Sequence, residues 1–355
     1  MKKRKKIHIF KKYGFFLLFF EIFSNINNME QLLKDLIQFA LNKRSTDIHF
    51  ILSNHQLKIT LRTPNGFESL IQDIWNESFF EYLKYKSHFD LTNPYLPQSG
   101  QFSIFLKKEI FCRFSLIVNQ QLQTGVLRIL NMNLDLKIDE LCHDSEVIQY
   151  FHSLTCKRSG LVIFSGPTGS GKTTTLHAIL HEISLQGLHK VVSLEDPVEI
   201  KDNYYLQLQI NEAQGFTYEK GIEELLRHDP DVIFIGETRN TYTAQMVLRA
   251  CLTGHFVFTT IHAKNGLETI ERLMDLGLPY KELKMVLTAV ISQRLYSSKN
   301  GRECIYEILS NEQLQYAFEN RKYSSDFENL KRKIQKNIEN GNLIDQQARY
   351  DLLDL

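Results

Sequence analysis

Paired cysteines are missing from this sequence. Its five cysteines are scattered along the chain, and no two of them form a C-x-x-C pair (Cys112, Cys142, Cys156, Cys251 and Cys304). A zinc site therefore has no paired ligands to build on, and a disulfide framework is not expected in a chain of 355 residues. The pattern favours reduced, structural thiols in a cytosolic protein.

The sequence also lacks an excess of charge of either sign. Lysine and arginine number 42, and aspartate and glutamate number 41, which gives a formal net charge of +1. This balance argues against a broad surface for nucleic acid or membrane, and leaves a local basic patch open. With 43% hydrophobic and 23% charged residues, the composition is that of a soluble globular protein, and the length predicts two domains.

No hydrophobic run at the start of the chain is long enough to span a bilayer, which takes about 20 apolar residues. The run Phe15–Phe20 follows a lysine-rich segment, as in a signal peptide, but Glu21 interrupts it and no small-residue cleavage site follows. Three interpretations of residues 1–28 stay open: a peripheral membrane anchor, a disordered extension, or a start annotated too early. We favour the last, because an amphipathic helix opens at Met29, and we predict that the mature protein begins there.

The first domain is expected over residues 29–132. Apolar residues recur at helical spacing from Glu30 to Asn42, and a second helix is expected between Trp75 and Lys86. Segments that alternate apolar and polar residues predict a largely antiparallel sheet: Asp47–Leu52, Leu57–Arg62, Gln101–Leu106, Ile110–Val118 and Gln123–Leu130. Together these features indicate a small α+β domain, and the polar residues 133–144 are typical of a linker.

The second domain, residues 145–310, has a different pattern. Short and fully apolar strands alternate with helical stretches, and the strands are Leu161–Ser165, Val191–Leu194, Val232–Ile235 and Phe256–Ile261. The pattern predicts a doubly wound α/β domain whose ligand binds at the carboxyl ends of the strands. From Glu282 onward the chain looks helical, and residues 311–355 are expected to form a helical tail with a solvated surface.

A phosphate-binding loop of the form G-x-x-x-x-G-K-[ST] follows the first of these strands. Its residues are Gly166, Pro167, Thr168, Gly169, Ser170, Gly171, Lys172, Thr173 and Thr174, and a helix is expected over Thr174–Ile183. Glycines let the backbone N–H groups wrap a triphosphate. Lys172 should reach the β- and γ-phosphates, and the Thr173 hydroxyl should bind Mg²⁺. The sequence therefore predicts an ATP and Mg²⁺ site.

Polar residues at the ends of other apolar strands are candidates for the same site. Glu237 lies just past the strand Val232–Ile235 and is the better candidate for activating water. Asp231 could hold Mg²⁺, although it lies at the start of that strand, at the opposite end from the phosphates. Glu195 and His262 each follow or end an apolar strand and would converge on the edge that carries the phosphate loop.

Four segments, in this order and spacing, resemble the signature boxes of the secretion and pilus traffic ATPases: Gly166–Thr174, Ser193–Glu199, Leu226–Arg239 and Gly254–His262. The family includes type II secretion motors, type IV pilus assembly and retraction motors, and competence-pilus ATPases. Further segments extend the resemblance to Ser45–His49, Glu268–Gly277, Gln293–Leu295 and Gly301–Leu309. The resemblance implies a RecA-like P-loop domain preceded by a PAS-like one.

The resemblance also implies roles for individual residues. Glu195 would be the carboxylate of the aspartate box, Glu237 the catalytic glutamate, and His262 a histidine that senses the phosphate. Arg113 and Arg128 match arginines of the family's first domain that close over the nucleotide and neutralise charge on the γ-phosphoryl group. Further candidates of the same kind are Arg227 and Arg239.

Two departures from the family pattern stand out. Type II secretion and many assembly members carry a C-x-x-C zinc insertion between the segments that match Gln293–Leu295 and Gly301–Arg302, where this sequence has only Tyr296–Asn300. No zinc is therefore expected. Without this module and without the long extra amino-terminal domain of those enzymes, the sequence most resembles the competence-pilus members. The second departure is Asn240, where the family commonly has aspartate.

The resemblance implies a Mg²⁺-dependent, homo-hexameric motor in the cytoplasm, attached peripherally to the inner face of the membrane through a platform protein. A pilus retraction or type II secretion motor remains an alternative with the same catalytic boxes. A direct nucleic-acid translocase would need a basic channel with stacking aromatics, so no direct nucleic-acid contact is expected. A regulatory module with an inactive site conflicts with the joint presence of Lys172, Thr173 and Glu237.

Overall fold

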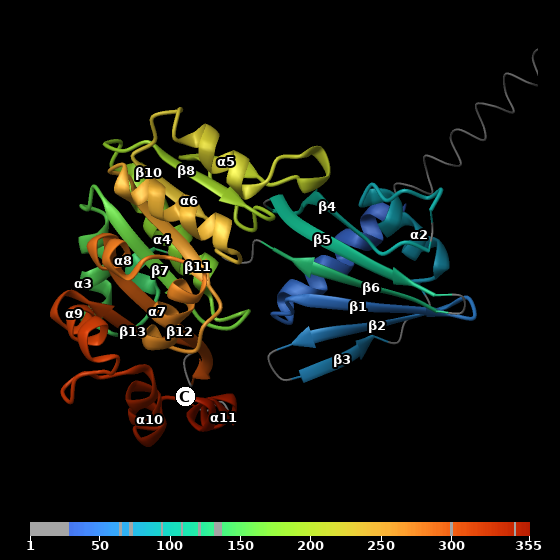
Figure 1. Cartoon of the computed structure of the whole chain (residues 1–355). Helices are drawn as coiled ribbons and strands as arrows, with labels where there is room; N and C mark the ends of the chain where they lie inside the picture. The colour runs from blue at the N-terminus through green and yellow to red at the C-terminus, as the bar shows by residue number, and fades with distance from the viewer. Residues whose placement is uncertain are drawn as a thin grey trace, which may run out of the picture. The chain divides into compact units, whose positions relative to one another are not determined.

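The computed structural model describes residues 28–63, 66–70, 74–93, 95–107, 109–119, 122–130, 137–298, 301–343 and 346–355. The chain forms two compact units that divide between residues 132 and 133, and each is described here by itself (Figure 1). The predicted extension, except for its last residue, and the first part of the predicted linker lie outside the described residues. No helix of the described ranges has the length and apolarity needed to cross a bilayer.

The first unit is an antiparallel sheet packed against two helices. Its strand order is β3-β2-β1-β6-β5-β4, with β1 Asp47–Ser53, β2 Gln56–Thr63, β3 Gly66–Leu70, β4 Gln98–Phe105, β5 Glu109–Val118 and β6 Leu122–Ile129. Residues 28–42 are helical, and α2 spans Glu77–Lys86. Alternate residues such as Phe50 and Phe114 are buried in one core with Leu36, Phe79 and Phe80 of the helices. The predicted strands are all present, and β3 was not predicted.

The second unit is built on a seven-stranded sheet of order β13-β12-β7-β11-β10-β8-β9 (Figure 1). All neighbouring strands are parallel except the edge pair β12 and β13. The strands are β7 Gly160–Ser165, β8 Val191–Glu195, β9 Leu206–Gln209, β10 Val232–Ile235, β11 Phe256–Ile261, β12 Leu287–Ser298 and β13 Gly301–Ser310. The four predicted parallel strands are confirmed within one residue at each end.

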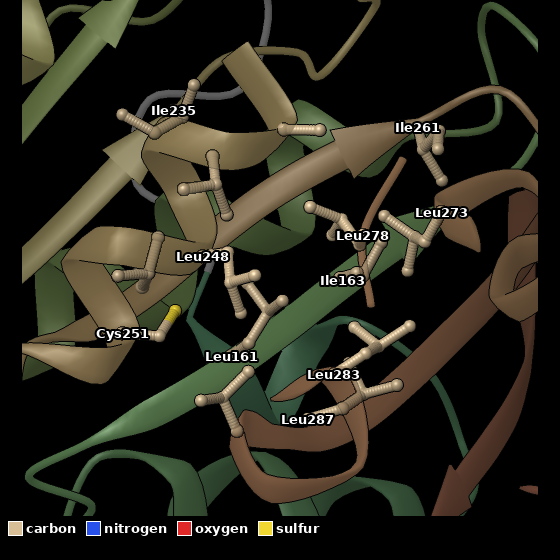
Figure 2. Packing of buried hydrophobic residues seen from close by; sticks show 14 of the residues in the cluster. Leu161, Ile163, Ile235, Leu248, Cys251, Ile261, Leu273, Leu278, Leu283 and Leu287 are labelled. Carbon is tan, nitrogen blue, oxygen red and sulfur yellow. The ribbon is translucent and has the colours of Figure 1, made fainter. Parts of the chain in front are cut away.

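Helices cover both faces of this sheet, which makes the predicted doubly wound fold. One core holds residues of α5 (Tyr218–Leu225), α6 (Thr241–Leu252), α7 (Gly266–Asp275), α8 (Tyr280–Val286) and α9 (Asn311–Asn320). Figure 2 shows Leu248, Leu273 and Leu283 of these helices packed around Leu161 and Ile163 of β7. The other core joins the sheet to α3 (Ser145–Leu154) and α4 (Lys172–Leu185).

The expectation of a helical chain from Glu282 onward is wrong. The helix α8 ends at Val286, and β12 and β13 follow it. Burial explains the difference. β12 lies beside the interior strand β7, where hydrogen bonding within the sheet satisfies its buried backbone. The rest of the tail is helical, but α10 (Leu330–Glu339) and α11 (Gln346–Asp354) bury Ile334 and Ala348 against Tyr296 and Ile305 of the sheet.

The end of the segment predicted as a linker packs onto the second unit. Ile138 and Leu141 are buried in the core that contains α3 and α4. His143 Nδ1 lies 2.5 Å from Glu303 Oε2 on β13, and Lys333 on α10 pairs with Asp144 at 3.3 Å. Residues 138–144 are therefore an ordered part of the second unit rather than a free connection.

Candidate active site

The phosphate loop connects β7 to α4. The strand ends at Ser165, and the helix begins at Lys172, two residues earlier than predicted. Gly169 has φ +81° and Gly171, the N-cap of α4, has φ +89°. Residues with a side chain rarely adopt these conformations, so the two glycines allow the loop to turn into the helix. The loop thus ends at the N-terminus of a 14-residue helix, where backbone N–H groups favour an anion.

Gly166 is required for a different reason. A Cβ atom placed on it would lie 2.6 Å from the carbonyl oxygen of Gln293 and 2.7 Å from Ser170 Oγ. Its φ of +148° is also positive. The start of the loop therefore packs tightly against the backbone of β12.

Lys172 is buried at the first turn of α4, and its amino group points back along the loop. Nζ donates to the carbonyl oxygens of Gly166 at 2.8 Å and Pro167 at 3.0 Å. Burial lowers the pKa of Lys172 to about 8, and the carboxylate of Glu237 partly opposes this shift. Within the described ranges the hydrogen bonds of this buried ammonium group go to neutral carbonyls, which phosphate oxygens can replace.

The residues present fit the phosphate tail of a nucleotide. Ser170 Oγ is buried and has no hydrogen-bond partner among the described residues. An orphaned polar atom inside the loop, next to a buried lysine and a helix N-terminus, indicates that a polar ligand belongs there. Thr173, half-buried on the first turn of α4, would hold a Mg²⁺ ion through its hydroxyl group.

The strand register brings three predicted residues to the edge that carries this loop. Ile261 at the end of β11 pairs with Ser165 at the end of β7, and His262 follows directly. On β10, Ile235 pairs with Leu194 of β8 and with Thr259 of β11. Glu237 and Glu195 therefore lie at the carboxyl ends of their strands, on the same edge as the loop.

Glu237 and His262 face each other across this edge. Glu237 Oε1 lies 3.4 Å from His262 Nε2, and Oε2 pairs with Arg239 Nη2 at 2.8 Å. Burial lowers the pKa of His262, and the charge of Lys172 lowers it further. The imidazole is therefore neutral at neutral pH, so it can both donate and accept a hydrogen bond beside the carboxylate.

Glu195 is a buried carboxyl group on the last residue of β8. Its Oε1 accepts hydrogen bonds from Ser193 Oγ at 2.7 Å and from Gln207 Nε2 at 3.2 Å. Burial raises the pKa of Glu195 to about 7, against the effect of these two hydrogen bonds. Near neutral pH the group exchanges a proton readily, which is a property of functional carboxyl groups.

Asp231 does not reach this site. It precedes β10, and its Oδ2 accepts from the backbone N–H of Lys190 at 2.7 Å. A strand rises about 3.3 Å per residue, so the four residues of β10 separate Asp231 from the phosphate edge by well over 10 Å. The predicted role of Asp231 as a Mg²⁺ ligand is therefore wrong for this fold. Arg227, the other candidate arginine of this unit besides Arg239, is exposed and pairs with Glu224 at 2.5 Å.

Arg113 and Arg128 lie side by side in the first unit. They are opposite each other on β5 and β6. Arg128 pairs with Asp47 at 2.7 Å, and Arg113 donates to Ser99 Oγ at 3.0 Å. Both residues are on one face of the sheet because paired residues point the same way. Their predicted closure over the nucleotide stays a prediction.

Asn240 has a local structural role. It is the N-cap of α6, and its side chain accepts from the backbone N–H of Thr243 at 2.8 Å. Asparagine and aspartate cap helices about equally well. The departure from the family's aspartate at this position therefore preserves the cap, and the asparagine amide also donates to Glu219 Oε1 at 3.5 Å.

Sequence reasoning gave no role to the polar residues of β12. Gln293 donates from Nε2 to the carbonyl oxygen of Ser170 at 2.7 Å, and Ser292 Oγ lies 2.7 Å from Ser165 Oγ. Arg294 is buried as well. The sequence signal for these contacts is the polar run Ser292–Arg294 within the apolar segment Leu287–Ser298. The prediction of a helix from Glu282 onward hides it.

Comparison with known proteins places this site in a family. The family model described as Type II/IV secretion system protein matches residues 24–351. The chain belongs to this family. Competence protein ComGA of Bacillus subtilis (strain 168) is 30% identical over 343 residues, which cover 90% of this chain and 96% of the relative. Family and fold together imply an ATPase of secretion or pilus machinery.

Two solved structures of similar proteins support the fold of this Type II/IV secretion system protein. The ATPase DotB of Legionella pneumophila aligns with a TM-score of 0.74 at 18% identity, over 91% of this chain and 96% of its own. The pilus retraction motor PilT with bound ADP aligns with a TM-score of 0.72 at 23% identity, over 90% of this chain and 96% of its own. The RecA-like fold of the second unit is thus confirmed, and the PAS-like description of the first stays a prediction.

Proposed function

We propose that this protein is a Mg²⁺-dependent ATPase that powers assembly of a type IV-like competence pseudopilus for DNA uptake. One arrangement carries the proposal: a buried lysine at a helix N-terminus lies on the same sheet edge as a carboxylate paired with a neutral histidine. These are the groups that phosphoryl transfer to water needs, namely charge neutralisation, an orienting base and a hydrogen-bonding partner for the phosphate.

Each residue has a distinct task in this proposal. The backbone N–H groups of the loop and the ammonium group of Lys172 bind the β- and γ-phosphates of ATP. A Mg²⁺ ion held by Thr173 would neutralise charge on these phosphates. Glu237 accepts the proton of the attacking water or orients that water. Arg239 pairs with this carboxylate at 2.8 Å, and neutral His262 donates a hydrogen bond toward the phosphate or the water.

The wider machinery is part of the proposal. The protein would act as a homo-hexamer in the cytoplasm, bound peripherally at the inner face of the membrane to a platform protein. Arg113 and Arg128 of the first unit would close over the nucleotide, so that hydrolysis becomes domain motion. The named similarity to competence protein ComGA over 96% of that relative supports competence as the process.

The proposal is tested by ATP turnover and by transformation. Lys172→Ala should abolish turnover and leave the fold intact, while Lys157→Ala, an exposed lysine away from the loop, should change neither. In a strain that lacks the chromosomal copy, the wild-type gene and the Lys157→Ala variant should restore transformation by added DNA, and the Lys172→Ala variant should not. Undiminished turnover in Lys172→Ala would reject the site, and full transformation without the gene would reject competence.

A further inference from the structure

Arg294 is a buried charge where three segments of the second unit meet. Its side chain, on β12, is 8% exposed. Nη1 donates to the carbonyl oxygen of Gln293 at 3.0 Å, and Nη2 donates to that of Lys264 at 2.9 Å. Nε lies 3.6 Å from Oδ2 of Asp351 on the last helix, α11. The planar guanidinium therefore fixes these three groups relative to one another.

The two carbonyl groups belong to the segments that form the nucleotide site. The Gln293 carbonyl is the one against which Gly166 packs, and the Gln293 side chain holds the carbonyl of Ser170 in the phosphate loop. Lys264 lies two residues after His262. Arg294 thus sets the spacing between the loop that carries Lys172 and the segment that carries His262.

Asp351 is itself held in place by its surroundings. Its Oδ2 accepts from the hydroxyl of Tyr296 at 2.6 Å, and its Oδ1 accepts from Gln347 Nε2 at 3.0 Å. Ala348 of the same helix is buried beside Tyr296 and Ile334. The carboxylate therefore meets Arg294 in a defined position, set by the packing of α11 on the sheet.

We propose that Asp351 is a positioning residue of the nucleotide site, which acts through Arg294 to hold the phosphate loop and the His262 segment in register. A buried guanidinium that loses this carboxylate keeps only the more distant attraction of the Glu307 carboxyl group, and it shifts toward other acceptors or water. The carbonyls of Gln293 and Lys264 would then move with it. The inference rests on the proposed function, because it assigns Asp351 to the same site.

Asp351→Asn tests this inference, because asparagine keeps the size and an oxygen acceptor for Tyr296 but removes the charge. Two variants serve as controls. Asp354→Asn removes an exposed carboxylate from the same helix, and Ile334→Val loosens the packing beneath α10 without touching the ion pair. For each variant, kcat and KM for ATP, the affinity for a fluorescent ATP analogue, and Tm are measured in the full chain.

We expect Asp351→Asn to lower kcat and to weaken analogue binding by about tenfold each, because small displacements of aligned groups have effects of this size or larger. Both controls should stay within about twofold of wild type, even if Ile334→Val lowers Tm as much as Asp351→Asn does. The inference is overturned if Asp351→Asn matches wild type in kcat and affinity, or if Ile334→Val loses as much. A wild-type chain that binds the analogue without hydrolysing ATP would refute the proposed function, while the affinities would still decide the role of Asp351.

Discussion

Lys172 donates a hydrogen bond of 2.8 Å to the carbonyl oxygen of Gly166, the first residue of its own loop. The lysine thereby keeps the loop curved around its own ammonium group. A phosphate group that enters must replace this bond with a stronger, charge-assisted one. Because that bond needs the ammonium form of Lys172, nucleotide binding should depend on the protonation of this one amino group.

Nucleotide affinity is predicted to fall in mildly alkaline solution. Burial lowers the pKa of Lys172 to about 8, so the free protein loses this charge as the pH rises through that value. If only the ammonium form binds, affinity for an ATP analogue should be constant near neutral pH and fall by up to about tenfold per pH unit above 8. Fluorescence titration over about pH 6.5 to 9.5 measures this.

Lys172→Arg is the matched control, because a guanidinium stays charged over the whole range. Above pH 8, where Glu195 is already ionised, whatever affinity this variant retains should not fall as the pH rises. A wild-type affinity that stays flat to the alkaline end of the range would contradict the account of Lys172.

Glu195→Gln is predicted to stabilise the protein at alkaline pH. Burial raises the folded-state pKa of Glu195 from 4.5 to about 7, so the folded chain holds a proton that the unfolded chain releases in this window. The stabilisation linked to that proton is complete below 4.5 and is lost as the pH rises through 7. Glutamine does not ionise, and it keeps an oxygen acceptor for Ser193 and Gln207.

Well above pH 7, the unfolding free energy of Glu195→Gln is expected to exceed that of the wild type by on the order of 3 kcal/mol, because the pKa rises from 4.5 to about 7 on folding. Denaturant unfolding of both proteins at about pH 5 and 8.5 measures the difference. If the variant and the wild type differed in unfolding free energy by the same amount at both pH values, folding would not raise the pKa of Glu195, and the prediction would be wrong.

Much of this site could be predicted from the sequence. The phosphate loop, Glu237 and His262 stand directly after apolar strands, and parallel strands end at one edge. The sequence did not predict β12, because Leu287–Ser298 has no clear strand alternation when both of its faces are buried. With β12 unrecognised, the contacts of Gln293 and Arg294 with the loop could not be foreseen, since they depend on which strands become neighbours.

Gly166→Ala is predicted to weaken nucleotide binding strongly. The added Cβ would lie 2.6 Å from the Gln293 carbonyl oxygen, so either the loop or β12 has to shift. Gly187→Ala is the control: Gly187 also has a positive φ, +66°, but a Cβ there would meet nothing within 4 Å. The backbone strain is about 1 kcal/mol in Gly187→Ala and larger in Gly166→Ala, because a φ of +148° lies outside the left-handed helical region. Only Gly166→Ala should lose affinity for the ATP analogue. Equal affinities in the two variants would contradict the tight packing described for the loop.

The capping role of Asn240 predicts which substitutions the start of α6 tolerates. Asn240→Asp should lower the free energy of unfolding by no more than about 0.5 kcal/mol. Its carboxylate accepts the same bond from the Thr243 N–H, but it loses the 3.5 Å bond that Asn240 Nδ2 donates to Glu219 Oε1 and adds a like charge there. Asn240→Ala removes the acceptor and should cost about 1 kcal/mol. Denaturant unfolding of the two variants tests the capping role. If Asn240 were instead catalytic, Asn240→Asp would change the rate of ATP turnover.

The central claim, hydrolysis of ATP at the edge shared by the loop, Glu237 and His262, is tested most directly by Glu237→Gln. Glutamine preserves the shape of the side chain but cannot accept a proton from water. The account predicts that this variant binds Mg²⁺ and ATP with nearly wild-type affinity by calorimetry, while its steady-state turnover falls by about a hundredfold or more. Turnover within a few-fold of wild type at full occupancy would contradict it.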